Sequence, residues 1–315
     1  MDRIELTFTD ADGRKVGIKR SFSIDVDYGP DGSNDFEVAL AEGDSLPMHG
    51  FAYIDGTEYG GIVDRRGFDT TGDAPVSRWG GRSWHGILSH SVVVPTGEHY
   101  TMSGDANAAI GELIAAQGLD GVFRAAPYKS GFTLNHRVDR FADAYSAMLD
   151  ALSGVGARLS IRRAGSLTEL SAVPAVTEYR YDGSALLNTR PVNHLVCGGG
   201  GEGAERLVVH LYADESGNVS RTQTLFGVDE VAEFYDYTSA DEARLVEDGT
   251  KRLTEHYADR MESDVQEPED PDLNVGDSVV LTNHASGFTQ TEAVSEVTAT
   301  ISSDDGIAVS YTLGG

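Results

Sequence analysis

The stretch Asn193-His-Leu-Val-Cys-Gly-Gly-Gly-Gly-Glu-Gly-Ala-Glu-Arg-Leu-Val-Val-His-Leu-Tyr212 decides between two classes of fold. Gly198, Gly200 and Gly203 have the GxGxxG spacing of a dinucleotide-binding turn, which needs a helix directly after the glycines. Residues 206–212 are instead apolar and β-branched, which predicts a strand, and no Lys-Ser/Thr pair follows as in a phosphate-binding loop. The glycines therefore indicate a bend between strands, where positive φ or close backbone approach is required.

Strands also dominate the sequence before this stretch. Apolar and polar residues alternate in segments 4–8, 22–26 and 36–38, which indicates strands with one wet face. Turns are predicted at Asp12-Gly13 and at 29–32, and longer buried strands at 60–63 and 83–88. We expect a first β-barrel or small sandwich over residues 1–98.

Two helices are expected after residue 98. The first has Ala106, Ile110, Leu113 and Ile114 on one face and Gly118 at its C-terminal cap. The second has an apolar face of Phe141, Tyr145, Met148, Leu149 and Leu152, with Gly154 at its end. Segments 157–161 and 167–172 then form a predicted hairpin. Residues 99–175 are thus expected to be an α+β insert.

Later segments return to strands, at 194–197, 206–212 and 230–237. A capping box at Ser239-Ala-Asp-Glu242 opens a helix with Val246, Gly249, Leu253, Tyr257 and Met261 on one face and a Glu247–Lys251 pair. Residues 262–272 are acidic, contain Pro268 and Pro271, and are typical of a linker. A strand at 278–281 and a hairpin turning at Asp305-Gly306 follow. We therefore expect second-barrel strands with a connecting helix at 176–262 and a small C-terminal β domain at 273–315.

The charge balance restricts the possible partners. With 24 Lys and Arg against 51 Asp and Glu, the formal charge is −27, which argues against a protein that grips nucleic acid. The N-terminus lacks the regions of a secretion signal, and no apolar run approaches about 18 residues, so no membrane insertion is expected. We expect synthesis in the cytoplasm.

No residue stands out as a catalytic, cofactor-binding or metal site. The single cysteine, Cys197, excludes internal disulfides and multi-cysteine zinc sites, and its apolar setting predicts an inert buried thiol. No GxSxG or HExxH motif occurs. The histidines have no compact ligand spacing: His49, His85, His90, His99, His136, His194, His210, His256 and His284.

Three weaker signals leave alternatives open. Acidic residues are so numerous that a pair able to hydrolyse a glycan would arise by chance. Loop aspartates could hold calcium, although they lack EF-hand spacing: Asp10, Asp12, Asp25, Asp27 and Asp31. Trp79 and Trp84 could form a sugar platform, but a core or subunit contact is the stronger reading.

Three segments together resemble a siphophage tail protein family of Gram-positive phages and prophages. They are Trp79–Leu88 with Val94-Pro95, the glycine-rich segment 193–212 ending in Glu-Gly-x-x-Arg, and Val275-Gly-Asp277 before a closing hairpin. Their order and spacing are similar to the family over most of the chain. The family is similar to phage baseplate-hub proteins.

This resemblance implies tandem tube-like β-barrels interrupted by an α+β domain. It also implies a trimeric ring in the phage tail, which joins the tail tube or distal tail protein to the tip or fibre and lets DNA pass without specific binding. The expected role is structural rather than enzymatic, with no cofactor and a place in the virion. The alternatives are a tail-associated peptidoglycan hydrolase and a receptor- or carbohydrate-binding module.

Overall fold

The chain divides into two compact units in the computed structural model. One unit comprises residues 1–182 and 265–313, and the other comprises residues 183–264 with the last two residues. The structure describes residues 4–30, 32–70, 76–95, 97–177, 179–181, 185–201, 203–258, 261–266, 273–283, 288–303 and 306–314.

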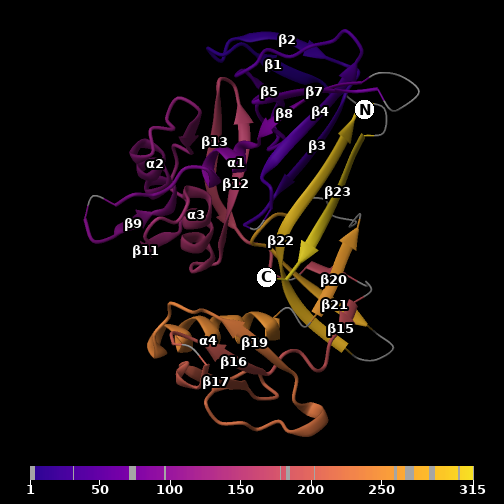
Figure 1. The fold of residues 1–315 in the computed structure, drawn as a ribbon. Coiled ribbons are helices and arrows are strands. Elements are labelled where there is room, and N and C mark those ends of the chain that lie inside the picture. The colour runs from indigo at the N-terminus through magenta and orange to yellow at the C-terminus, as the bar shows by residue number, and fades with distance from the viewer. Residues whose placement is uncertain are drawn as a thin grey trace. The chain divides into compact units, whose positions relative to one another are not determined.

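A large antiparallel sheet dominates the first unit, with the strand order β23-β22-β3-β4-β8-β7 (Figure 1). Its strands are β3 (Ser23–Tyr28), β4 (Asp35–Ala41), β7 (Arg65–Asp69), β8 (Val76–Arg82), β22 (Phe288–Ser302) and β23 (Gly306–Leu313). The predicted alternation is confirmed, since Ile24, Val26, Phe36 and Val38 are buried on one face. Period-two patterning therefore gives this sheet one apolar and one wet face.

The C-terminal strands belong to this same sheet. β22 pairs with β3, so that Ile301 lies opposite Ile24. β21 (Ser278–Asn283) pairs with β22 and, in parallel, with β14 (Tyr179–Tyr181). Segment 273–315, expected as a separate small domain, thus shares a sheet with the N-terminal strands.

A smaller sheet in the first unit has the order β2-β1-β5-β6. Its strands are β1 (Leu6–Thr9), β2 (Lys15–Lys19), β5 (Phe51–Ile54) and β6 (Gly60–Ile62). The predicted Asp12-Gly13 turn is confirmed, with Gly13 at φ +76°. Both sheets are open among the described residues, so the chain itself shows sheets where a barrel was expected.

The predicted α+β elements follow. Helices α2 (Ala106–Ala116) and α3 (Ala144–Ser153) lie on one side of the β12–β13 hairpin (Figure 1). The strands here are β9 (Tyr100–Asp105), β10 (Phe123–Ala125), β11 (Thr133–Val138), β12 (Ala157–Ala164) and β13 (Leu167–Pro174). Asp105 and Asp143 cap the two helices, and Gly118 takes φ +67° directly after α2, as its predicted role requires.

The second unit is an open four-stranded sheet covered on one face by a helix. The strands, in the order β18-β17-β16-β19, are β16 (His194–Gly198), β17 (Val208–Ala213), β18 (Val219–Ser220) and β19 (Ala232–Asp236). Helix α4 (Glu242–Ala258) packs Leu245 and Leu253 on Leu195, Cys197 and their neighbours. Short 3₁₀ turns η1 (Gly203–Glu205) and η2 (Gly227–Asp229) also belong to this unit. Strand β15 (Ala185–Leu187) pairs with β20 (Met261–Gln266), and the division between the units falls within β20, after residue 264.

The prediction of a strand at 83–88 is wrong. After β8 ends at Arg82, the chain forms helix α1 (Trp84–Ser89), whose N-terminus is capped by the Ser83 side chain. Trp84, Ile87 and Leu88 have the i, i+3, i+4 spacing of one helix face, and all three are buried. A short apolar run fits a strand or a helix equally well, and here the serine cap and tertiary packing decide.

Other local predictions also need correction. Asp241, rather than Ser239, caps α4 by accepting from the Arg244 N–H at 2.9 Å. The expected Glu247–Lys251 pair is replaced by Arg244–Glu247 and Lys251–Glu255. Met261 begins β20 instead of extending the helix, so the linker expected from 262 starts as a strand. Its remainder, 267–272 with Pro268 and Pro271, and Asp305 lie outside the described residues.

No helix in the described part of the chain is long and apolar enough to span a membrane.

Candidate assembly surfaces

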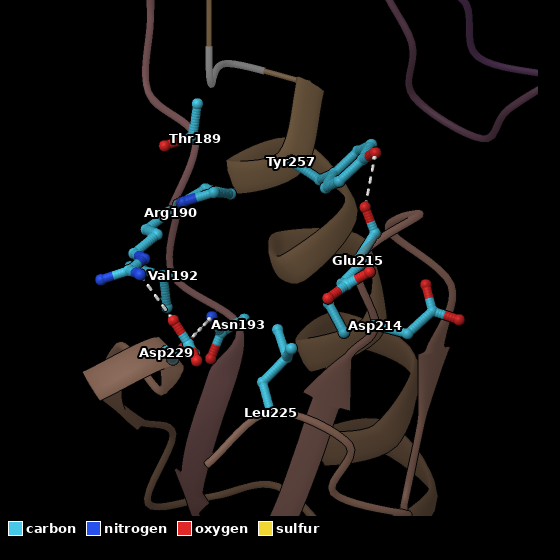
Figure 2. Close-up of a pocket in the computed structure, with 11 residues that line it drawn as sticks. Thr189, Arg190, Val192, Asn193, Asp214, Glu215, Leu225, Asp229 and Tyr257 are labelled. Carbon is cyan, nitrogen blue, oxygen red and sulfur yellow. Dashed lines mark hydrogen bonds and ion pairs between the residues drawn. The ribbon is translucent and has the colours of Figure 1, made fainter. Parts of the chain in front are cut away.

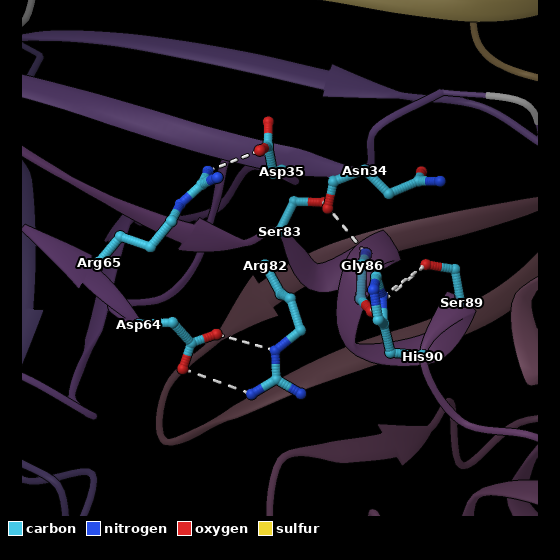
Figure 3. Close-up of polar contacts among 9 residues, drawn as sticks. All are labelled: Asn34, Asp35, Asp64, Arg65, Arg82, Ser83, Gly86, Ser89 and His90. Carbon is cyan, nitrogen blue, oxygen red and sulfur yellow. Dashed lines mark hydrogen bonds and ion pairs between the residues drawn. The ribbon is translucent and has the colours of Figure 1, made fainter.

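Ion pairs cross the wet face of the large sheet and tie its outer strands together. Figure 3 shows two of the pairs, Arg65–Asp35 at 2.5 Å and Arg82–Asp64 at 2.8 Å. Arg78 pairs with both Glu37 and Asp69. Each is partly exposed, so each stabilises the fold by less than about 1 kcal/mol. Together they place paired charged side chains over β4, β8 and β7.

Strand β7 is the last strand of this sheet among the described residues. Most of it is exposed, and Phe68 keeps 83% of its surface accessible. An edge strand presents unpaired backbone N–H and C=O groups, which can pair with a strand of another chain. An exposed aromatic side chain on such an edge adds apolar area to that contact, so β7 is a candidate assembly edge.

The glycine-rich segment of the second unit binds the Arg206 side chain through its backbone carbonyl groups. The Arg206 guanidinium donates to the carbonyl oxygens of Gly198 and Gly199, both at 3.1 Å, pairs with Asp236, and lies 5.4 Å from the Phe234 ring centre. A Cβ on Gly198 would lie 2.8 Å from both that guanidinium and the Phe234 ring. Gly201 takes φ +99°, and a Cβ there would lie 2.7 Å from the Glu205 carbonyl oxygen, so glycine is required at that position, as predicted. The segment continues into η1 and β17 rather than an α-helix.

The second sheet has one face that α4 does not cover. His194, His210, Tyr212 and Phe234 lie on it by strand register, and Phe234 is 54% exposed. His194 Nδ1 lies 2.5 Å from Glu230 Oε1 and His194 Nε2 lies 2.8 Å from His210 Nδ1. Since a carboxylate only accepts, His194 Nδ1 donates to Glu230, and in the neutral form of His194 its Nε2 accepts from His210 Nδ1.

These histidines are sixteen positions apart in sequence and meet only through hairpin pairing, which spacing rules for compact motifs do not detect. Both ring nitrogens of His194 and the Nδ1 of His210 are occupied by the contacts within this pair and with Glu230. Among the residues that the structure describes, no group of three or more His, Cys, Asp or Glu side chains is arranged to hold a metal ion.

The other residues named above as possible sites lie in the core, in a turn or in a strand. Cys197 lies in the core of the second unit, where burial raises the pKa of its thiol. Trp84 is fully buried and Trp79 is 9% exposed, so both belong to the core rather than an exposed platform. Asp10 accepts from the Asp12 and Arg14 N–H groups in the first hairpin turn, and Asp25 accepts from Thr300. Asp31 lies outside the described residues.

The Val275-Gly-Asp277 motif is a buried junction in the first unit. Asp277 is fully buried, accepts from the Val176 N–H at 2.6 Å and pairs with Arg158 Nε of β12 at 2.9 Å. Gly276 takes φ +92°, which permits the turn. The neighbouring Asn274 amide donates to both oxygens of Glu58, at 2.8 and 2.9 Å. The motif thus joins the C-terminal strands to the α+β layer.

Glu58 extends this junction toward β3 and α1. Burial raises the pKa of Glu58 and that of Asp277 despite the hydrogen bonds that each accepts. The Tyr28 ring stacks on the His85 ring at 3.9 Å between centres, and His85 Nε2 lies 3.8 Å from Glu58 Oε2. Burial lowers the pKa of His85 to about 3, so this imidazole is neutral in the folded protein.

A cavity of about 420 Å³ opens in the second unit where β16 begins and β17 ends (Figure 2). Pro191, Val192, Leu225 and Tyr257 supply apolar surface, and Arg190 pairs with Asp229 at 2.7 Å. The other residues lining it are Thr189, Asn193, Ala213, Asp214 and Glu215. Sequence reasoning did not find this site because its residues come from segments 189–193, 213–215, 225–229 and α4, which no local pattern connects.

Sequence comparison finds no family model and no curated protein that match the chain. Solved structures do match its fold. The 43 kDa tail protein of prophage MuSo2 from Shewanella oneidensis is 10% identical, with a TM-score of 0.52 over 98% of each chain. A chain in the structure of the phage P2 baseplate in its activated conformation with Ca is 11% identical, with a TM-score of 0.50 over 98% of each chain. The protein therefore has a fold found in phage tail and baseplate proteins.

Proposed function

We propose that this protein is a structural subunit of a phage-type tail tip and works by assembly rather than by catalysis. The observation that carries the proposal is the match in fold over 98% of both chains to a prophage tail protein and to a baseplate component. A fold alone can serve many functions, so the surfaces must supply the rest of the argument. Here the open sheets and the exposed β7 edge supply it.

In the proposed assembly, copies of the chain form a ring that acts as a hub between the tail tube and the tip or fibre. Strand edges left open in one copy pair with edges of the next, which completes tube-like barrels between subunits. The trimeric state, the barrels and the affiliation with siphophages of Gram-positive hosts are predictions from the sequence resemblance. The burial of Trp79 and Trp84 removes the observation that motivated a carbohydrate-binding module.

The wet face of the large sheet is the proposed lining of the DNA channel. Asp25, Asp27, Asp35 and Glu37 lie on it by register, with Thr298 and Thr300 beside them on β22. Carboxylates outnumber arginines on this face, so the backbone of passing DNA would be repelled rather than bound. Electron microscopy of assembled tails is expected to show this face on the channel wall, and a basic wall contradicts the channel part of the proposal alone.

The assembly proposal is tested with the substitution Phe68→Lys. Wild-type protein is expected to form oligomers with increasing concentration in mass-resolved chromatography and rings in electron micrographs. A lysine at position 68 puts charge on the exposed edge and is expected to weaken association about tenfold without changing the melting temperature. Val228→Lys is the matched control, because Val228 is 81% exposed but lies outside the strands. Wild-type protein that stays monomeric and forms no ring contradicts the proposal.

A further inference from the structure

The cavity of the second unit is built from chain segments whose charge is predominantly negative. Three acidic residues line it, Asp214, Glu215 and Asp229, against one basic residue, Arg190. The cavity also lies at the C-terminal end of α4, since Tyr257 is the penultimate residue of that helix. The aligned peptide dipoles of a helix place roughly half a negative charge at that end. Helix and side chains together favour a cation in the cavity.

The three carboxylates differ in the contacts that they already make within the chain. Asp214 accepts from the backbone N–H groups of Ser216 and Asn218, which fixes the turn after β17. Asp229 holds the guanidinium of Arg190. The Glu215 carboxylate makes no ion pair within the described part of the chain, although its backbone carbonyl accepts from the Tyr257 hydroxyl. Glu215 is therefore the acidic group left for an incoming cation.

The rest of the lining is suited to a flat or aliphatic group. Pro191, Val192 and Leu225 are apolar, and Figure 2 shows Leu225 at the base of the cavity with Arg190 and Tyr257 on opposite sides. One face of the Tyr257 ring packs on Gly217, where an added Cβ would lie 2.5 to 2.7 Å from three ring carbons, which leaves the other face for the cavity. A rigid aromatic ring beside a carboxylate is a favourable setting for a guanidinium, which stacks on aromatic surfaces and hydrogen-bonds carboxylates.

We propose that this cavity binds an arginine side chain presented by a segment of another tail protein. The aliphatic part of the arginine contacts Val192 and Leu225, and its guanidinium lies against Tyr257 and pairs with Glu215. The charge of −27 strengthens the attraction of a basic segment at long range. The inference rests on the proposed assembly role for the nature of the partner, but the cavity and its charge do not depend on that role.

The test uses the full ¹⁵N-labelled chain and a short probe, acetyl-Gly-Arg-Gly-amide, in an NMR titration. Shift changes are expected at residues of segments 189–193 and 213–215, with a Kd on the order of 1 mM for one side chain. The citrulline peptide has nearly the same shape without the charge and is expected to bind at least about tenfold more weakly. Equal binding of both peptides, or shift changes confined to other surfaces, overturns the proposal.

Two substitutions with opposite expected effects separate binding from folding. Glu215→Gln removes the available carboxylate and is expected to weaken the arginine peptide about fivefold, whereas Arg190→Gln removes the competing cation and strengthens it. Glu205→Gln is the charge-matched control, since Glu205 is exposed in η1 and does not line the cavity. Glu215→Gln that binds like wild type overturns the assignment.

Free spermidine is titrated in parallel. If it binds the cavity as strongly as the arginine peptide, the site recognises small cations rather than a side chain of a protein partner, and the proposed occupant is wrong. None of these measurements requires a ring, so their failure leaves the assembly proposal to be judged by its own experiment.

Discussion

Several polar residues are buried within the apolar core of the first unit. Arg163 is 1% exposed, and its guanidinium carbon lies 4.6 Å from the Tyr53 ring centre and 5.4 Å from that of Trp84. Its Nη1 donates to Thr168 Oγ1 at 3.3 Å, and no carboxylate pairs with it among the described residues. Aromatic faces thus replace part of the hydration that burial removes.

His85 makes the stability of the protein depend on pH. Its pKa is about 3 in the folded state and near 6.5 in an unfolded chain, so the unfolded state takes up a proton first as pH falls. The free energy of unfolding therefore loses about 1.4 kcal/mol per pH unit from this residue between pH 6.5 and 3. His85→Phe preserves the stacking on Tyr28 and is expected to remove that loss.

The measurement is urea unfolding of wild type and His85→Phe at several pH values. The difference in free energy of unfolding should move in favour of the variant as pH falls through this window, because the other titrating groups are common to both proteins. A difference that stays constant from pH 7 to pH 4 contradicts a neutral, buried His85.

The burial of some chemically reactive or charged residues could be predicted from the sequence, and that of others could not. The burial of Cys197 was predicted from its apolar strand alone, although the helix that covers it, α4, begins more than forty residues later. The roles of His85, Glu58 and Arg163 could not be predicted, since the groups that surround them come from segments tens of residues away. The residue type of each is known from the sequence, but its burial depends on the tertiary structure.

At the scale of elements, periodicity and caps predicted what lies within one helix or hairpin. The apolar faces of helices α2 and α3 were predicted, but their N-terminal caps, Asp105 and Asp143, were not. Phe141, which was expected on the second face, precedes α3 and is 59% exposed. Helix α1 was taken for a strand because its six residues are too few to separate the two periods. The turn at Val275-Gly-Asp277 was noticed only through resemblance, and its physical reason is the buried pair with Arg158.

That turn is tested by Asp277→Asn. The substitution keeps the shape of the side chain but removes the negative charge that pairs with Arg158 Nε at 2.9 Å in a largely buried site, and it is expected to lower the free energy of unfolding by about 3 kcal/mol. Asp12→Asn is the matched control, because the Asp12–Arg14 pair is exposed, and a change within about 0.5 kcal/mol is expected. Chemical denaturation followed by circular dichroism gives both values. If both variants lose less than about 0.5 kcal/mol of unfolding free energy, the buried pair does not stabilise the junction.

At the scale of the whole molecule, strand pairing was beyond sequence reasoning. Alternation marks residues 22–26 and 307–311 as strands, but nothing local says that β3 and β22 are neighbours across more than 250 residues. The single chain has open sheets where barrels were expected. In our proposal a barrel closes only when strands of several copies pair. The two units have separate apolar cores, one around Trp84 and α2 and the other around Cys197 and α4.

Separate cores predict that the two units lose stability separately, and the chain carries natural probes for each. Both tryptophans lie in the first unit, and the single cysteine lies in the second. A Cβ on Gly249 of α4 would lie 2.6 Å from Leu211 Cδ1 and 2.8 Å from Cys197 Sγ, so Gly249→Val overpacks the second core at a cost of about 2 kcal/mol. Labelling of Cys197 by a thiol reagent is therefore expected to accelerate more than about tenfold, while the tryptophan fluorescence transition stays unchanged. Gly111→Val in α2, whose Cβ would lie 3.3 Å from Ala125 Cβ, is the reciprocal control and should shift the fluorescence transition alone. If either substitution shifts both signals by the same free energy, the chain unfolds as one cooperative body and the division into two units has no energetic meaning.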